Sequence, residues 1–166
     1  YNVLEDITKA QNKGYEIWGQ VSCRPLTMEF TMNEPYMLEG LVAWKDYMIQ
    51  NTVEDRKNVL KNQEFRKAVL DEILDTTKNK LFVGNWEKIK LINTKRSSLS
   101  KHIGMNLLEI ANFYNKEPFD WLLDNAIEDG FEDLFVAELL NSDNIQVQKL
   151  LKHKYATIAL SDAGAH

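Results

Sequence analysis

Short strand-like runs separated by longer helical runs are the feature that most limits what this chain can fold into. One apolar and aromatic run covers residues 15–23 and is closed by Pro25. A second covers residues 157–160, near the end of the 166-residue chain. Helices that alternate with a few buried strands are typical of α/β folds. We therefore expect an α/β structure that is helix-rich and has a few short strands.

The remaining elements are predicted from the spacing of apolar residues. Helical spacing of apolar side chains, with cap-like residues at the ends, predicts most of them. Residues 86–92 alternate charged and apolar side chains, which predicts a half-buried strand at an edge or rim. Residues 134–140 suit a strand or a helix equally well. The predicted helices cover residues 4–11, 33–50, two short segments between 52 and 74, 106–114, 118–129 and 142–151.

Composition narrows the class of protein. Twenty Lys and Arg against 25 Asp and Glu give a net charge of −5, without a basic block that could neutralise a row of phosphates. No apolar run reaches the 18 or so residues that a membrane span needs, and the first residues do not resemble a signal peptide. The single Cys23 cannot form an internal disulfide or a thiolate metal cage, and we expect it to be a small buried side chain. We expect a cytoplasmic protein that binds neither nucleic acid nor membranes.

The last residues carry the clearest candidate for chemistry. The predicted strand at 157–160 runs into Ser161-Asp-Ala-Gly-Ala-His166. An acid such as Asp162 at the carboxyl end of a barrel strand can bind a metal or move a proton to and from a reacting group. It can equally cap a following helix or stabilise the turn through Gly164. The spacing alone leaves both interpretations open.

Five segments, taken in order, carry a resemblance to a known family. They are Ile17-Trp-Gly-Gln-Val-Ser-Cys-Arg-Pro-Leu26, Thr52-Val-Glu-Asp-Arg56 with Phe65-Arg-Lys-Ala-Val-Leu70, Asn106-Leu-Leu-Glu-Ile-Ala111, Glu117-Pro-Phe-Asp-Trp-Leu-Leu-Asp124 and Ala159-Leu-Ser-Asp-Ala-Gly-Ala-His166. Together they resemble the later part of metal-dependent amidohydrolases of the D-aminoacylase, or N-acyl-D-amino-acid deacylase, group. The last segment is the most specific, because it resembles the family signature that follows the eighth barrel strand.

The resemblance implies a fold, a reaction and a cofactor. The fold is a TIM-like (β/α)8 barrel, and the reaction is hydrolysis of a C–N amide bond in a small molecule by metal-activated water. The metal is zinc or a related divalent ion. Asp162 takes the position of the acid that binds the metal and shuttles the proton. Since a complete barrel needs about 250 residues, we expect residues 1–166 to be a single C-proximal fragment: later strands and a helical insertion, ending after the final barrel strand.

The other metal ligands of the family have no counterpart in this chain. The resemblance implies a His-x-His pair and further ligands on earlier strands, whereas this chain has three histidines, His102, His153 and His166. We expect His102 and His153 to be solvated surface residues, and His166 to lie near the site. A catalytic zinc needs about three protein ligands. The isolated chain is therefore expected to be inactive and to bind no metal.

Three residues at the end of the first predicted strand are candidates for substrate binding. Gln20, Ser22 and Arg24 would face the active site if this strand belongs to a barrel. Arg24 could bind a substrate carboxylate through two hydrogen bonds, or it could pair with a nearby Asp or Glu. The four tryptophans are expected in the core or in helix packing.

Two other functions compete with the leading interpretation. One is a cyclic amidohydrolase, similar to hydantoinase or dihydroorotase, and the other is a helical interaction or scaffold module without catalysis. A barrel fragment should hold residues 18–23 and 157–160 as parallel neighbours, whereas a helical module should not. Strands without their barrel partners would leave open edges, so we also expect self-association.

Overall fold

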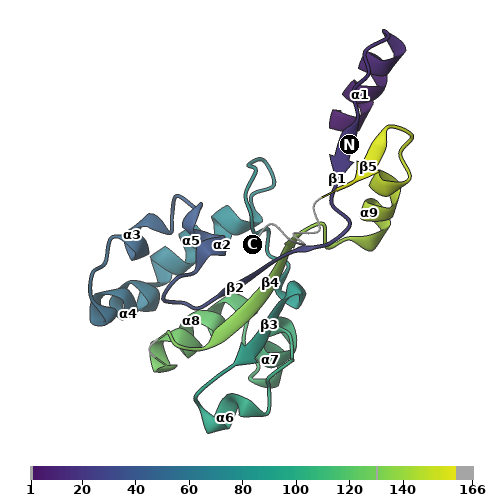
Figure 1. Ribbon diagram of the computed structural model, residues 1–166. Coiled ribbons are helices and arrows are strands. Elements are labelled where there is room, and N and C mark those ends of the chain that lie inside the picture. Colours follow the sequence, from purple (N-terminus) through teal and green to yellow (C-terminus); the bar gives the residue numbers. More distant parts are fainter. Residues whose placement is uncertain (1, 130, 160–166) are drawn as a thin grey trace. The chain divides into compact units, whose positions relative to one another are not determined.

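The computed structural model describes residues 2–129 and 131–159 of the chain. These residues form a mixed α/β structure in which five strands make two small sheets and close no barrel. Two compact units are present, one from Tyr1–Leu26 with Leu140–His166 and one from Thr27–Leu139 (Figure 1). The α/β class with many helices and few short strands is confirmed. The organisation of residues 1–166 as a single barrel fragment stays a prediction.

The first unit pairs two short strands and carries two helices. Its elements in chain order are α1 (Asn2–Asn12), β1 (Gly19–Val21), α9 (Asn144–Leu151) and β5 (Ala156–Ile158). Helix α1 ends just before Gly14, which has a φ of 90°. This left-handed conformation favours glycine and makes Gly14 the helix stop that the sequence predicts.

The second unit contains a three-stranded sheet in the order β2-β4-β3. The strands are β2 (Leu26–Phe30), β3 (Ile89–Asn93) and β4 (Leu134–Leu140), and β3 runs antiparallel to β4. Residues 134–140, whose sequence suits a strand or a helix, form strand β4 because they pair with β3. The prediction of an edge strand near residues 86–92 is confirmed, although residues Trp86–Lys88 form a 3₁₀ turn, η1. Strand β2 is not predicted from the sequence, because it begins directly after Pro25, and a proline is typical of a strand end.

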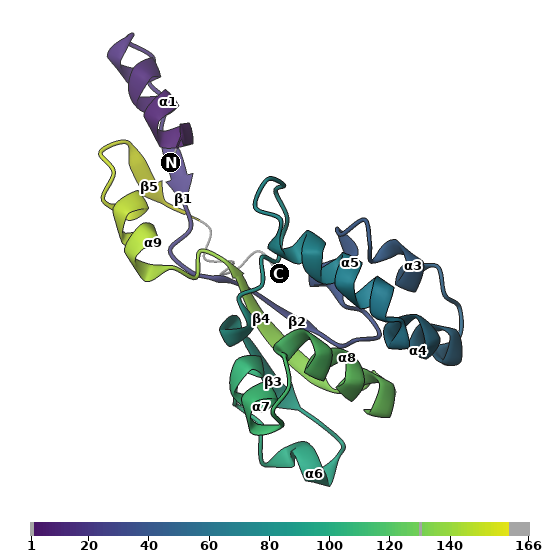
Figure 2. The same cartoon turned by 180° about the vertical axis from the view of Figure 1, so that it is seen from behind.

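Helices of the second unit lie beside this sheet and in a group next to it. Figures 1 and 2 show α3, α4 and α5 grouped together, and α6 and α7 next to β3. Contacts between α4 and α8 and between α7 and α8 connect the two sets. The bounds are α2 (Tyr36–Glu39), α3 (Lys45–Met48), α4 (Val53–Lys61), α5 (Gln63–Leu74), α6 (Ser97–Ser100), α7 (Leu107–Phe113) and α8 (Pro118–Asp129). No helix in these described ranges has the length and apolar character that crossing a membrane requires.

Side chains at the helix starts explain why several boundaries agree with the sequence. The Thr52 hydroxyl accepts a hydrogen bond from the Asp55 backbone N–H at 3.1 Å and begins α4. At α7, the Asn106 side chain accepts from the Glu109 N–H, and the Glu109 carboxylate accepts from the Asn106 N–H, both at 2.9 Å. Such caps satisfy backbone donors that a helix start leaves without partners. The local sequence is therefore enough to place these starts.

The prediction of one helix over residues 33–50 is wrong. The segment forms the short helices α2 and α3, separated by residues 40–44. The carboxylate of Glu72, on α5, accepts hydrogen bonds from the backbone N–H groups of Val42 at 3.0 Å and Ala43 at 2.8 Å. In a continuous helix these donors would bond to carbonyls four residues earlier. A side chain thirty residues away in the sequence therefore helps to divide the helix.

The core of the second unit is aromatic and closely packed. Trp44 and Tyr47 are fully buried, with ring centroids 4.7 Å apart, and Phe65 lies 5.4 Å from Trp44. The Tyr47 hydroxyl donates to the backbone carbonyl of Met32. Burial raises the pKa of Tyr47 to about 12, so the hydroxyl stays protonated and able to donate. This packing joins α3 to α5 and to the residues that follow β2.

Arg66 links three helices of the same unit. This largely buried side chain donates to Asp120 at 2.9 Å and to Asp124 at 2.6 Å, both on α8. Its Nε also donates to the Leu60 carbonyl at 2.7 Å, at the end of α4. A planar guanidinium can satisfy several acceptors at once, which suits a junction between helices. Arg66 therefore fixes α8 relative to α4 and α5.

We predict that Glu72→Gln lowers the free energy of unfolding by about 1–2 kcal/mol at pH 7, because a charged acceptor is replaced by a neutral one. Burial raises the pKa of Glu72, but the bonds from Ala43 and Val42 outweigh it and hold the pKa below its usual value. A depressed carboxyl pKa stabilises the fold above the unfolded pKa of about 4.3 and loses this effect as the pH falls. The measurement is urea unfolding at pH 7 and near pH 3.

The loss caused by Glu72→Gln should shrink at the lower pH. The exposed Glu87→Gln serves as a matched control and should change stability little at either pH. An equal loss for Glu72→Gln at both pH values would contradict the role of the charged carboxylate.

Candidate functional site

Strands β1 and β5 are parallel neighbours although more than 130 residues separate them in the sequence. The register places Gly19 opposite Ala156 and Val21 opposite Ile158. Beyond the strands, the Ala159 N–H donates to the Val21 carbonyl at 3.1 Å, which extends the pairing. The parallel arrangement that a barrel fragment would require is present between residues 19–21 and 156–158. Because parallel strands point the same way, the carboxyl ends of β1 and β5, at Val21 and Ile158, lie at the same edge of the sheet.

Alternation along β1 separates a covered face from an open one. A Cβ built on Gly19 would lie 2.7 Å from Leu4 Cδ2 and 3.0 Å from Ile7 Cδ1, so α1 covers this face directly. Successive residues of a strand point to opposite faces. Gln20 is therefore on the face away from α1, and Ser22 follows the end of the strand. Gln20 is exposed and Ser22 is half-buried.

Arg24 lies just beyond the end of β1, in a short turn with Ser22. The Ser22 hydroxyl donates to the Arg24 carbonyl at 3.2 Å, and the Arg24 N–H approaches the same hydroxyl at 3.4 Å. The Arg24 side chain is exposed, and no Asp or Glu among the described residues forms an ion pair with it. Gln20 thus lies within β1, and Ser22 and Arg24 follow its carboxyl end. Their role in substrate binding stays a prediction.

Asp162 and His166 lie outside the described residues. Their predicted roles, a metal-binding and proton-transferring acid and a neighbouring site residue, stay predictions. Within residues 2–129 and 131–159, no group of three or more His, Cys, Asp or Glu side chains is arranged to hold a metal ion.

Two side chains near β1 were predicted in the wrong environment. Cys23 is exposed rather than buried, because it follows β1 where the strand leaves the sheet. Trp18 is 56% exposed and touches Tyr155 edge-on, with ring centroids 5.8 Å apart. By contrast, Trp44 and Trp121 are buried as predicted. The errors occur where a two-stranded sheet is too small to cover its own side chains.

His102 and His153 are not the solvated residues that the neighbouring lysines suggested. His102 is only 2% exposed and lies against Phe113, with its ring nitrogens 3.3 Å from Met105 Sδ and from the Tyr114 hydroxyl. Burial, reinforced by Lys101, lowers its pKa, so the neutral form is favoured. His153 is half-buried. In both cases tertiary packing decides the environment, which adjacent charges in the sequence do not reveal.

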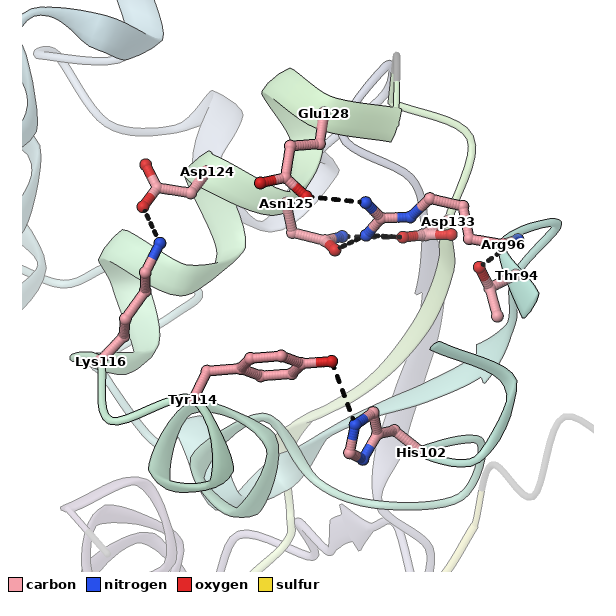
Figure 3. Close-up of polar contacts among 9 residues, drawn as sticks. All are labelled: Thr94, Arg96, His102, Tyr114, Lys116, Asp124, Asn125, Glu128 and Asp133. Atoms are coloured by element: carbon pink, nitrogen blue, oxygen red, sulfur yellow. Dashed lines mark hydrogen bonds and ion pairs between the residues drawn. The ribbon is translucent and has the colours of Figure 1, made fainter. Parts of the chain in front are cut away.

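A second group of polar residues, which was not predicted from the sequence, lies in the Thr27–Leu139 unit. Figure 3 shows Arg96, Lys116 and Glu128 around a hollow that is bounded by α8. The signal was present in the sequence. Asp124 and Glu128 lie three and seven residues after Trp121, which places all three on one face of a helix. When a helix has one buried apolar face, its polar face can be exposed to solvent or can line a cavity.

Comparison with known proteins adds no assignment. The chain matches no protein-family model, no curated protein and no solved structure.

We predict that Arg24→Gln changes the free energy of unfolding by no more than about 0.5 kcal/mol, because the side chain is exposed and lacks an ion pair with the described carboxylates. The matched substitution Arg66→Gln should lower it by about 2–4 kcal/mol, since it removes the donor to the Leu60 carbonyl and to Asp120 and one of the two donors to Asp124. Urea unfolding of both variants makes the comparison. A large loss for Arg24→Gln would mean that Arg24 is structural and not available for a ligand.

Proposed function

We propose that this chain supplies part of a metal-dependent amidohydrolase that hydrolyses the C–N amide bond of N-acyl-D-amino acids. The parallel pairing of β1 with β5 is the observation that carries the proposal. It supports a barrel-type arrangement over a helical scaffold, because a helical module gives no reason for two distant runs to pair in parallel. The incomplete (β/α)8 barrel, the zinc or related divalent ion and the cytoplasmic location belong to the same proposal.

The arrangement at the end of β1 supports a substrate that carries a carboxylate. Arg24 is exposed just beyond the edge where the parallel strands end. Gln20 lies on the strand face away from α1, and Ser22 is joined to Arg24 by a hydrogen bond. An arginine that is not held by an acid can bind a carboxylate through two parallel hydrogen bonds. An N-acyl amino acid presents such a carboxylate next to its amide. We assign Arg24 to the substrate carboxylate, with Gln20, Ser22 and His166 as neighbouring binding residues.

The proposal assigns the acid of the metal site to Asp162. In the sequence it follows β5 by four residues, and β5 ends at the same edge as β1. When bound, the metal would lower the pKa of a water molecule and make it nucleophilic at neutral pH. The remaining ligands would come from residues that are not part of this chain, so the 166-residue chain by itself is expected to be inactive.

Zinc-dependent release of free amino acid from a panel of N-acyl-D-amino acids tests this function. A longer protein that contains this sequence with the missing ligands should be active, and the 166-residue chain should not be. Asp162→Asn should reduce kcat by at least about 100-fold, as expected for a lost acid–base group. Asp143→Asn is the matched control and should have little effect, because asparagine also caps a helix start well.

The outcomes separate the competing functions. Hydrolysis of hydantoin or dihydroorotate without hydrolysis of N-acyl-D-amino acids would identify a cyclic amidohydrolase. A folded, metal-loaded longer protein that hydrolyses none of these amides would contradict the catalytic proposal and favour the scaffold function.

Self-association is a second part of the proposal. No other described strand pairs with β1 or β5, and Ile158 on β5 is 70% exposed. Parallel sheets are normally covered on both faces, and open strand edges pair readily with other chains. We therefore expect sedimentation experiments to show oligomers at a protein concentration on the order of tens of micromolar.

Ile158→Lys should shift the chain toward monomer, because a charge on a strand opposes edge pairing. Ile145→Lys, on α9 and 66% exposed, is the matched control and should leave the oligomers unchanged. A purely monomeric chain, or an equal effect of both substitutions, would contradict association through these strands.

A further inference from the structure

A cavity of about 270 Å³ lies in the Thr27–Leu139 unit. It is bounded by the loop after β3, which carries Arg96, by the residues that follow α7, and by one face of α8 (Figure 3). Ligand pockets commonly have volumes of about 300–1,000 Å³. This cavity lies just below that range, so it suits a ligand of few atoms.

Helix α8 presents two different faces. One face is buried in the core and consists of Phe119, Leu122, Leu123 and Ala126. The other face lines the cavity and consists of Trp121, Asp124, Asn125 and Glu128. Each set has the spacing that puts its members on one side of a helix. The polar set therefore meets the cavity as a row, with Trp121 at its apolar end.

Two charged groups of the cavity, Arg96 and Asp124, each bind at least one side chain that is buried. Arg96 donates to the side chain of Asn125 and lies 3.5 Å from the carboxylate of Asp133, both of which are buried. Asp124 accepts a bond from Arg66 at 2.6 Å. Burial raises the pKa of Asp124, but its bonds to Lys116 and Arg66 outweigh this and keep the pKa below its usual value. Arg96 and Asp124 are thus a fixed cation and a fixed anion at the cavity wall.

Each fixed group also has a more exposed partner. Glu128 binds Arg96 at 3.0 Å, and its side chain is 70% exposed. Lys116 binds Asp124 at 2.5 Å, and its side chain is 43% exposed. Ion pairs of exposed side chains contribute little stability. Glu128 and Lys116 can therefore move into solvent, while Arg96 and Asp124 keep their inner partners.

We propose that this cavity binds a free α-amino acid with an apolar side chain. The ligand carboxylate takes the place of Glu128 on Arg96, and the ligand ammonium takes the place of Lys116 on Asp124. A zwitterion can pair with both fixed groups at once and adds no net charge to the two cations and two anions of the lining, whereas a ligand with one charge can pair with only one of them. This inference rests on the cavity alone and does not use the proposed amidase activity.

The apolar lining accounts for the side chain of the ligand. The rings of Tyr114 and Trp121 are stacked, with centroids 6.1 Å apart and planes 25° from parallel, and Leu99 is buried beside them. Aromatic rings add stabilisation when they stack in an offset arrangement. Phenylalanine is therefore a suitable probe, because its ring can contact this surface.

In the first experiment, phenylalanine and its analogues are titrated into the 166-residue chain, and binding is measured by calorimetry and by two-dimensional NMR. Both enantiomers of phenylalanine are compared with 3-phenylpropanoate, which lacks the ammonium, and with phenethylamine, which lacks the carboxylate. We expect at least one enantiomer to bind with a dissociation constant below about 10 mM, a modest affinity for a ligand of this size. Each analogue with one charge should bind at least about tenfold weaker.

The exchange of ion pairs predicts gains in affinity, which a misfolded variant could not produce. Glu128→Gln removes the competitor for Arg96 and should strengthen binding of phenylalanine and 3-phenylpropanoate about two- to fivefold, without improving phenethylamine. Lys116→Gln removes the competitor for Asp124 and should strengthen phenylalanine and phenethylamine, without improving 3-phenylpropanoate. The exposed Glu54→Gln, on α4, is the matched control and should change none of these affinities.

Several outcomes would overturn the proposal. One is absence of binding by both enantiomers up to about 10 mM. Another is equal binding by either analogue with one charge. A third is unchanged or weaker phenylalanine binding in both Glu128→Gln and Lys116→Gln.

Discussion

The structure depends on one constraint: strands β1 and β5 pair in parallel, although more than a hundred residues lie between them in the sequence. Closing so long a loop is unfavourable in entropy unless the intervening chain folds compactly and brings its ends together. The second unit does this, because its entry strand β2 and its exit strand β4 are neighbours in one sheet. The pairing of Gly19 with Ala156 thus depends on the fold of a unit to which neither residue belongs.

Within the second unit, long-range polar contacts decide how the helices are arranged. Glu72 binds the backbone between α2 and α3, and Arg66 ties α8 to the end of α4. Both side chains lie on α5, which therefore organises its neighbours on two sides. Arg66 also holds Asp124 in place from behind, so the helix junction and the wall of the cavity share one interaction.

Much of the secondary structure could be predicted because its causes are local. Thr52 and Asn106 cap the helices that follow them, and Gly14 ends the first helix in a left-handed conformation. The sequence was misleading or ambiguous where a distant partner decides. The helix predicted over residues 33–50 is divided with the help of Glu72, and residues 134–140, which suit a strand or a helix, form a strand because they pair with β3. Similarly, the lysine next to His102 in the sequence suggested an exposed side chain, but aromatic side chains bury it.

By itself, the sequence determined the α/β class, several helix starts and the strand character of two distant runs, because periodicity, capping residues and strand-forming runs act over a few residues. That these two runs pair in parallel was decided by the tertiary structure. The sequence also marked Gln20, Ser22 and Arg24 as residues at a strand end. Only the tertiary structure decided which charged side chains meet. Arg96 and Glu128 are 32 residues apart, and the fold of the second unit brings them to one cavity. Contacts of this kind depend on how helices and strands pack, which no local pattern in the sequence encodes.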